Sequence, residues 1–361
     1  MELSVIIPTY NENENVELLV SKLSDALNGI DWEVIFVDDD SPDGTANIVR
    51  DIAKENWNVR ILHRIGRRGL SSACIEGMLS SSAPYFAIID GDLQHDETIL
   101  PEMLRYMKDD DLDIVVASRY ADNGGTGDWD RSRVKKSQFA TKLSKVIIPS
   151  ELTDPMSGFF MIKRESFEKS VRNLSSIGFK ILVDLFASSP TPFKFREVPY
   201  EFRSRLNGKS KLDATAVWDY ILLLLDKLVG KWIPVRFISF TIIGGSGIIV
   251  HLLIFSILFH IFHRSFIISQ SIAMMVAMIS NYILNNILTY KDQKLKGFAW
   301  LTGFVSFSIV CIVGAFANVG VASYMFKENA GWAFSALTGI LIGAVWNYAM
   351  TRIFTWHKVR R

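Results

Sequence analysis

Two hydrophobic patterns divide the chain. Up to about residue 212, short apolar runs alternate with amphipathic stretches, and the rest is almost continuously apolar. The segments 3–12, 32–45, 59–64 and 85–92 have the apolar character of strands, and three of them end in polar residues. Helical periodicity appears over 16–27, and further helices are expected after the second strand and from about residue 70. Strands that alternate with helices predict a Rossmann-like α/β domain with a mostly parallel sheet.

Four apolar runs in the second part contain no Asp, Glu, Lys or Arg: 237–263, 265–290, 297–326 and 329–351. Each is longer than the roughly 20 residues that cross a bilayer's hydrocarbon core. Of the 77 charged residues, 66 lie in residues 1–236 and only 11 lie beyond. We therefore expect four transmembrane helices, the last reaching about residue 356, after a domain that faces water.

Positive charges set the expected orientation of these four helices. They lie before the first run, between the second and third runs, and at the chain end: Lys227, Lys231, Arg236, Lys291, Lys294, Lys296, Lys358, Arg360 and Arg361. Four alternating spans bring these three sites to one side, which the positive-inside rule makes cytoplasmic. The chain opens without a recognisable signal peptide, so the N-terminal domain is expected on that side too.

The ends of the second and fourth apolar runs resemble each other. "SNYILNNILTY" and "WNYAMTRIFTW" align with a shift of 66 positions, which pairs Asn281-Tyr282 with Asn347-Tyr348 and Thr289-Tyr290 with Thr355-Trp356. Two hairpins of the same orientation are therefore predicted, related by an axis along the membrane normal. Interfacial anchoring of aromatic side chains is the alternative explanation.

Composition excludes several other classes of protein. The net charge of +1 gives no indication of nucleic-acid binding. Cys74 and Cys311 are far apart and lack metal-ligand spacing, so neither a disulfide framework nor a zinc site is expected.

The stretch "IIDGDLQHD" (88–96) carries the strongest chemical signal in the first part. Asp90, Asp92, Gln94 and His95 follow an apolar strand, and ligands bind at the carboxyl ends of strands in open α/β sheets. Carboxylate and amide oxygens suit a hard divalent cation, whereas imidazole suits softer metals. We therefore expect a cation at this end of the strand and a structural role for His95. Helix capping is the alternative explanation.

Several motifs together resemble the family 2 glycosyltransferases of the GT-A fold, and more narrowly the dolichyl- or polyprenyl-phosphate mannose synthases. They are "SVIIPTYNE", "VDDDSPDGT", "RGLSSACIEGM", "DGDLQH", "SRY", "DPMSGFF", "GFK" and "RLNGKSKL". This resemblance covers about residues 2–235. The apolar tail is similar to the small GtrA-like membrane proteins that accompany polyprenyl-linked sugar transfer.

The resemblance implies a set of donor-site residues. It assigns donor binding to Pro8, Tyr10, Glu12, Val37, Asp39, Asp90, Gly91, Asp92, Gln94, Lys180, Arg205 and Lys211. Within this set, Asp92 and Gln94 are expected to contact Mg²⁺ or Mn²⁺. Arg203 and Lys209 remain alternatives to Arg205 and Lys211. Asp90, Asp92 and Arg119 are the expected catalytic residues.

Acceptor binding needs positive charge, because the attacking phosphate is itself anionic. "WDRSRVKKS" supplies this charge, and the family pattern matches Trp129, Arg133 and Ser137. Arg133 and Ser137 are four apart, so they share one helical face. Arg119 matches a family arginine near both phosphates. Asp184 lies where relatives place a catalytic carboxylate, but a phosphate that is already ionised needs no strong base.

These inferences predict three segments: a GT-A domain over 1–212, an amphipathic interfacial helix over 213–234, and a GtrA-like domain of four transmembrane helices over 235–361. The residues 139–149 are a second candidate for an interfacial helix. The expected activity is inverting transfer of mannose from GDP-mannose to a dolichyl or polyprenyl phosphate at the cytoplasmic membrane face. The alternatives are a UDP-glucose-dependent glucosyltransferase and a lipid-linked sugar translocator.

Overall fold

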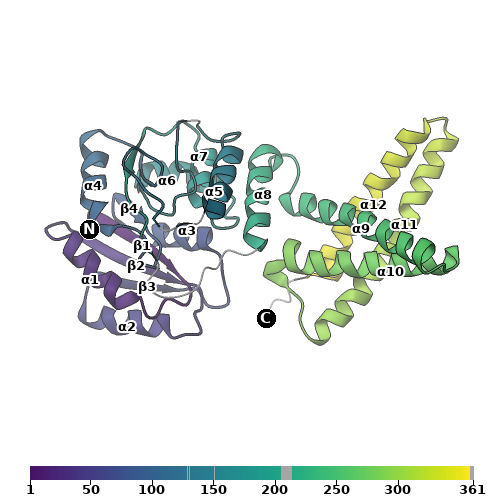
Figure 1. Ribbon diagram of the computed structural model, residues 1–361, viewed down its shortest axis with the longest axis horizontal. Coiled ribbons are helices and arrows are strands. Elements are labelled where there is room, and N and C mark those ends of the chain that lie inside the picture. The colour runs from purple at the N-terminus through teal and green to yellow at the C-terminus, as the bar shows by residue number, and fades with distance from the viewer. Residues whose placement is uncertain (128, 130, 150, 205–213, 358–361) are drawn as a thin grey trace. The chain divides into compact units, whose positions relative to one another are not determined.

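The computed structural model describes residues 1–127, 129, 131–149, 151–204 and 214–357. They form two compact units, Met1–Val229 and Gly230–Arg361 (Figure 1).

A seven-stranded sheet forms the centre of the first unit. Its strands are β1 (Leu3–Thr9), β2 (Trp32–Asp38), β3 (Val59–His63), β4 (Tyr85–Ile88), β5 (Ile114–Ser118), β6 (Phe160–Lys163) and β7 (Phe195–Pro199). Their order is β3-β2-β1-β4-β6-β5-β7, and only β6 runs antiparallel to its neighbours. The mostly parallel sheet predicted from the sequence is confirmed. Strands β5, β6 and β7 are not among the strands predicted from the sequence.

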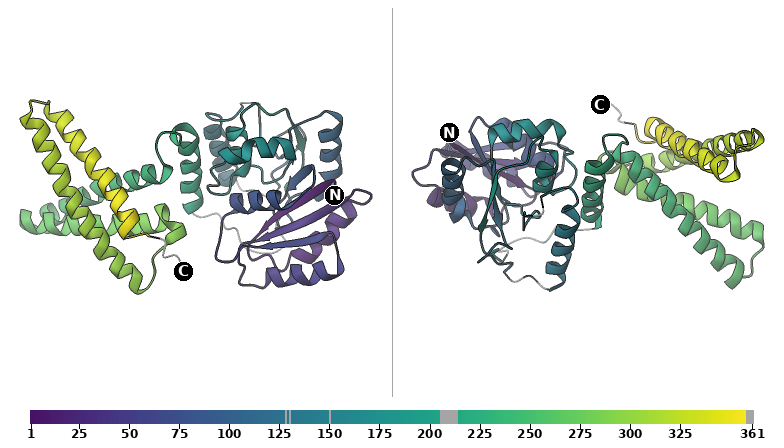
Figure 2. Two further views of the ribbon diagram at one scale, coloured as in Figure 1. Left: turned by 180° about the vertical axis from the view of Figure 1, so that it is seen from behind. Right: turned by 90° about the horizontal axis from the view of Figure 1, so that it is seen from above.

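Helices cover both faces of this sheet (Figure 2). They are α1 (Val16–Ala26), α2 (Thr45–Glu55), α3 (Leu70–Ser80), α4 (Leu100–Asp109), α5 (Arg131–Ser144), α6 (Arg164–Ser170), α7 (Ile181–Ser188) and α8 (Ala214–Val229), with 3₁₀ turns η1 (Glu97–Ile99) and η2 (Val171–Asn173). Alternate residues of β1 enter separate cores: Val5 and Ile7 join α1 and α4, while Ile6 joins α3 and α7. Burial on both faces explains why the strands are continuous apolar runs.

The second unit consists of four long helices, α9 (Val235–Ser256), α10 (Phe266–Leu284), α11 (Phe298–Lys327) and α12 (Trp332–Phe354). The π-helical turns η3 (Ile257–Ile261) and η4 (Asn285–Thr289) extend α9 and α10, and the 3₁₀ turn η5 (Lys291–Gln293) follows. All four helices are long and apolar enough to cross a membrane. The helices pack as two hairpins, α9 with α10 and α11 with α12.

Equivalent contacts hold each hairpin together. The hydroxyls of Ser239 and Thr289 form a hydrogen bond of 2.7 Å in the first hairpin. Those of Ser306 and Thr355 form one of 3.1 Å in the second. Two asparagines also occupy equivalent places: Asn281 lies against Gly247, and Asn347 lies against Gly314, where a Cβ would collide with the carboxamide. Small residues at these points let the helix backbones approach closely.

The contacts between the two hairpins are reciprocal. Tyr348 packs on Phe237 and Phe240 of α9, and its counterpart Tyr282 packs on the equivalent residues Phe304 and Phe307 of α11. Reciprocity of this kind is what a two-fold relation between two copies of a unit requires. The contacts therefore agree with the repeat predicted from the sequence.

The rings of Tyr290 and Trp356, which the 66-residue shift makes equivalent, stack on each other. Their centroids are 4.2 Å apart and their planes differ by 6°. Trp356 also donates its indole N–H to Asn286 Oδ1 at 3.1 Å. At this end of the unit, Arg236 and Asp292 form an ion pair at 2.8 Å, so the start of α9 and the segment after α10 lie together.

Replacing Trp356 should show how much its contacts with Tyr290 and Asn286 contribute to stability. Trp356→Ala removes the stack and the N–H bond and should cost about 3 kcal/mol of stability, as truncations of buried aromatic residues do. Trp356→Phe keeps an aromatic ring and should cost about 1 kcal/mol. Thermal unfolding of the full-length protein in detergent measures both. Trp332→Ala, at a residue that is 77% exposed, is the control. An equal loss in the control would contradict this account.

Candidate active site

The predicted polar residues gather where β1, β2 and β4 end. Pro8 and Val37 are register partners in adjacent parallel strands. A Cβ at Gly91 would lie 3.3 Å from Thr9 Cγ2 and 3.7 Å from Glu12 Cγ, so the ends of β1 and β4 meet there. The carboxyl edge of the sheet thus brings together residues from three separate motifs.

Asp90 lies beside a buried histidine. His95 Nε2 is 3.2 Å from Asp90 Oδ2, and Nδ1 is 2.8 Å from the Tyr200 hydroxyl. The rings of Phe159, Tyr200 and Phe202 surround the imidazole. Burial alone would raise the pKa of Asp90, but the hydrogen bond from His95 and the nearby positive charges lower it below its ordinary value. Asp90 is therefore an anion at neutral pH, and the contacts of His95 are compatible with the structural role predicted for it.

Hydrogen bonds orient the side chains of Asp92 and Gln94. The Gln94 backbone N–H donates to Asp92 Oδ1 at 3.2 Å, and Gln94 Nε2 donates to the Arg203 carbonyl at 3.0 Å. A carbonyl only accepts, so the amide nitrogen must face Arg203 and the amide oxygen takes the opposite end. Within the described ranges, no three His, Cys, Asp or Glu side chains are grouped to hold a metal ion. A carboxylate and an amide oxygen fit a hard cation that takes its remaining ligands from phosphate and water.

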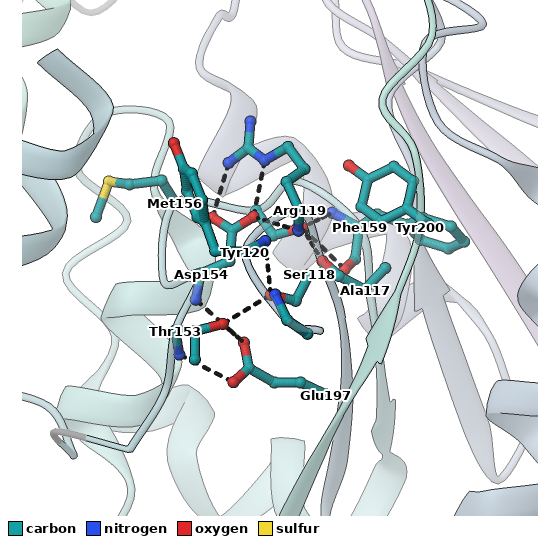
Figure 3. Close-up of polar contacts among 12 residues, drawn as sticks. Ala117, Ser118, Arg119, Tyr120, Thr153, Asp154, Met156, Phe159, Glu197 and Tyr200 are labelled. Atoms are coloured by element: carbon teal, nitrogen blue, oxygen red, sulfur yellow. Dashed lines mark hydrogen bonds and ion pairs between the residues drawn. The ribbon is translucent and has the colours of Figure 1, made fainter. Parts of the chain in front are cut away.

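A buried ion pair holds Arg119, and Figure 3 shows it. Asp154 is fully buried and accepts from the Arg119 backbone N–H, Nε and Nη2 at 3.0, 2.7 and 2.8 Å. Burial opposes the charge of Arg119, but the hydrogen bond to Asp154 and its negative charge raise the arginine's pKa. The third guanidinium nitrogen points away from Asp154 (Figure 3). Glu197 supports the carboxylate by accepting from the Asp154 N–H at 3.1 Å.

Two further cations join Arg119. Lys180 precedes α7 and donates to the Met156 carbonyl at 2.9 Å. Burial, and to a lesser degree the charge of Arg119, lower the pKa of Lys180 to about 8. The guanidinium carbons of Arg119 and Arg133 lie 4.7 and 4.0 Å from the centroid of the Trp129 ring, which packs against both. The site therefore combines acidic residues with a cluster of three basic side chains.

The expected nucleoside residues are held by the segment before α3. The Arg68 guanidinium lies 4.2 Å from the ring centroid of Tyr10. Asp39 accepts from Arg64 Nη1 at 2.5 Å and from the Gly69 N–H at 2.6 Å, although burial dominates and raises the pKa of its carboxyl group. These contacts attach the segment 64–69 to the ends of β1 and β2.

The remaining candidates include Ser137, Asp184 and Arg203, whose surroundings the structure describes. Ser137 lies on α5, and its shielded hydroxyl has no hydrogen-bond partner among the described residues. Asp184 is fully buried in α7 and pairs with Lys227 of α8. Arg205 and Lys211, and the alternative Lys209, lie outside the described residues. Arg203 pairs instead with Asp96 and Glu97.

Asp154, Glu197 and Tyr200 were not predicted as site residues from the sequence. Asp154 stands in the quoted motif "DPMSGFF", but no chemistry was assigned to it. A carboxylate close to a strongly apolar stretch, here "FFMI" (159–162), indicates a buried positive partner, because an unpaired buried charge is costly. That signal could have found Asp154, but the identity of its partner needs the fold.

Both halves of the chain match models of known protein families. A model of glycosyl transferase family 2 matches residues 4–171, and one of the GtrA/DPMS transmembrane domain matches residues 239–356. A dolichol-phosphate mannosyltransferase from Pyrococcus furiosus is 32% identical over 358 residues, which is 99% of both chains. One from Saccharomyces cerevisiae is 33% identical over 268 residues, covering 72% of this chain and 95% of the other.

Among solved structures, glucosyl-3-phosphoglycerate synthase from Mycobacterium tuberculosis, in complex with phosphoglyceric acid, is 20% identical with a TM-score of 0.47. That match covers 63% of this chain and 79% of the other.

The sheet with its acidic and basic edge defines a glycosyltransferase of the GT-A fold, followed by a multi-pass membrane domain. The chain belongs to the family of dolichol-phosphate mannosyltransferases. This confirms the family, the fold class and the enzyme class predicted from the sequence.

Neutralising Asp154 should leave Arg119 buried without its counter-charge. Asp154→Asn is expected to cost about 3 kcal/mol of stability, as breaking a buried ion pair does. It should also lower glycosyl transfer strongly. Thermal unfolding and product formation by the full-length protein measure the two effects. The control is Asp111→Asn, which removes an exposed ion pair with Lys163. A variant at Asp154 that is as stable and active as this control would contradict the role of the pair.

Proposed function

We propose that the protein transfers mannose from GDP-mannose to a dolichyl or polyprenyl phosphate, with inversion, at the cytoplasmic face of the membrane. The observation that carries the proposal is the cluster of Arg119, Arg133 and Lys180 beside the carboxylates of Asp90 and Asp154. Two phosphorylated substrates need several cations, and a leaving diphosphate needs a divalent metal. Identity to mannosyltransferases along nearly the whole chain supports the choice of sugar.

Donor binding is assigned to the ends of β1, β2 and β4. Tyr10, Glu12 and Asp39 would hold the nucleoside, and Pro8 and Val37 would shape its pocket. Asp92 and Gln94 would hold Mg²⁺ or Mn²⁺, which neutralises the leaving diphosphate when bound. Lys180 would contact the donor phosphates, and Arg205 and Lys211 are proposed to do so as well. Asp90, fixed by His95, would orient the donor sugar.

The acceptor phosphate is assigned to Arg119, Arg133 and Ser137. One oxygen of the lipid phosphate attacks the anomeric carbon, the bond from that carbon to the diphosphate oxygen breaks, and GDP leaves with the electron pair. A phosphate monoester has its second pKa near ~6, so it is already ionised at neutral pH. The residues therefore have to position the phosphate and screen its charge. Arginine suits this task because its planar fork can bind phosphate through two parallel hydrogen bonds.

Exposed apolar side chains on α5 and α8 support a position at the membrane surface. Phe139 on α5 is 69% exposed, and Val217, Ile221 and Leu228 lie exposed on α8. Large apolar side chains on amphipathic helices favour the headgroup boundary, where a lipid phosphate is found. In the second unit, the Arg236–Asp292 pair brings two of the positive sites together, which supports a cytoplasmic assignment for that end.

The direct test is an incubation of purified full-length protein with radiolabelled GDP-mannose, dolichyl phosphate and Mg²⁺ or Mn²⁺. A labelled lipid that releases mannose on mild acid treatment is the expected product. Label incorporated from UDP-glucose but not from GDP-mannose would overturn the choice of donor. No product with either donor would overturn the proposal as a whole.

Asp92→Ala tests the metal assignment in the same assay. Loss of one of two side-chain ligands should lower transfer at least about a hundredfold, and excess EDTA should abolish transfer by the unaltered protein. Asp25→Ala, at an exposed position of α1, is the matched control. Transfer by Asp92→Ala at the control's rate, or activity that persists in EDTA, would contradict a cation at this place.

Lys180 should give donor binding a pH dependence. Its pKa is lowered to about 8, so it is charged below that pH and loses its proton as the pH rises through it. Donor affinity, measured by calorimetry without lipid, should fall about tenfold between pH 7 and 9. Lys180→Arg stays charged over this range and should show little change. The same fall in Lys180→Arg would assign the dependence to another group.

A further inference from the structure

A buried ion pair links α7 to α8, the helix that directly precedes the membrane domain in the sequence. Lys227 Nζ lies 2.7 Å from Asp184 Oδ1. The Asp184 side chain is fully buried and the Lys227 side chain is only 9% exposed. Such a pair is costly to bury unless further hydrogen bonds satisfy both groups.

Those hydrogen bonds are present on both sides. Lys227 Nζ also donates to the Asn173 carbonyl at 2.9 Å and to Ser188 Oγ at 2.8 Å. Asp184 accepts from the backbone N–H and hydroxyl of Ser175 and from the N–H of Ser176. A carboxylate with this many donors has its acceptor positions occupied. It is suited to holding structure rather than to removing a proton from a substrate.

The pair lies one helical turn from the cationic cluster of the site. The Asp184 N–H donates to the carbonyl of Lys180 at 3.2 Å, so the two residues share the first turn of α7. The Lys180 side chain in turn reaches the Met156 carbonyl beside Arg119 and Asp154. A shift of α7 would therefore move Lys180 directly.

Two other contacts hold α8 against the site. The Tyr220 hydroxyl donates to the Ala140 carbonyl at 2.7 Å, which ties α8 to α5, the helix that carries Arg133. A Cβ at Gly178 would lie 3.0 Å from Asp219 Cβ, so α8 packs directly on the "GFK" segment. One helix thus contacts both the element that carries Lys180 and the element that carries Arg133.

We infer that Asp184 and Lys227 are a positioning pair, which fixes Lys180 through α7 by fastening this helix to α8. Asp184 is then not a general base. The inference rests on the proposed function for its activity assay, because Lys180 is assigned to the donor phosphates there.

The test is a double-mutant cycle in the full-length protein, with Asp184→Asn, Lys227→Met and the two combined. Loss of either partner should lower kcat about 10- to 100-fold, because small misplacements of a catalytic group cost this much. The double variant should be no slower than the slower single variant, since both substitutions break the same link. Additive losses, with a severe effect of Asp184→Asn and a slight effect of Lys227→Met, would assign Asp184 as a base and overturn the inference.

A second measurement does not depend on activity. Reductive methylation of lysines, followed by mass spectrometry, should label Lys180 several-fold faster in each single variant than in the unaltered protein. The matched control is Glu165→Gln with Lys169→Met, which removes an exposed pair on α6 and should change neither labelling nor kcat. Variants that unfold at lower temperature but keep the original kcat and Lys180 labelling would show a merely structural pair. An inactive unaltered protein would count against the proposed function, and the labelling result would still decide this inference.

Discussion

The buried pair of Arg119 and Asp154 is the interaction on which the site depends. Arg119 directly follows β5, and Asp154 lies in the segment that leads into β6, the antiparallel strand between β4 and β5. Charges this deeply buried are stable only when paired and hydrogen-bonded, so the pair fixes the distance between two neighbouring strand ends. Trp129 packs on the same guanidinium, and through it the position of Arg133 also depends on this pair.

The acidic and basic side chains of the site shift each other's pKa values. The carboxyl group of Asp90 keeps a lowered pKa although burial opposes its charge, because it interacts with His95, Lys180 and Arg119. Lys180 has a lowered pKa for the opposite reason, because burial and the charge of Arg119 disfavour its charged form more than Asp154 and Asp90 favour it. Binding of an anionic substrate would favour the charged lysine. A bound anionic substrate would thus supply negative charge that favours the protonated form of Lys180.

Sequence reasoning predicted those features that depend on local pattern. The apolar runs located β1, β2, β4 and the four long helices, and the polar residues after β4 marked the site. Contacts between distant segments could not be predicted in this way. Nothing near Arg119 indicates Asp154 as its partner, because β6 enters the sheet antiparallel and out of sequence order. Asp184 had been considered as a base from its place in the chain, and only the fold shows that Lys227 lies beside it.

The reciprocal contacts of the membrane unit have a consequence for its biosynthesis. The first hairpin is synthesised before the residues on which it packs. Tyr282 of α10 contacts Phe304, Phe307 and Trp356, all of which come later in the chain. Part of the contact between the hairpins therefore cannot form until α11, α12 and the segment that carries Trp356 have been synthesised.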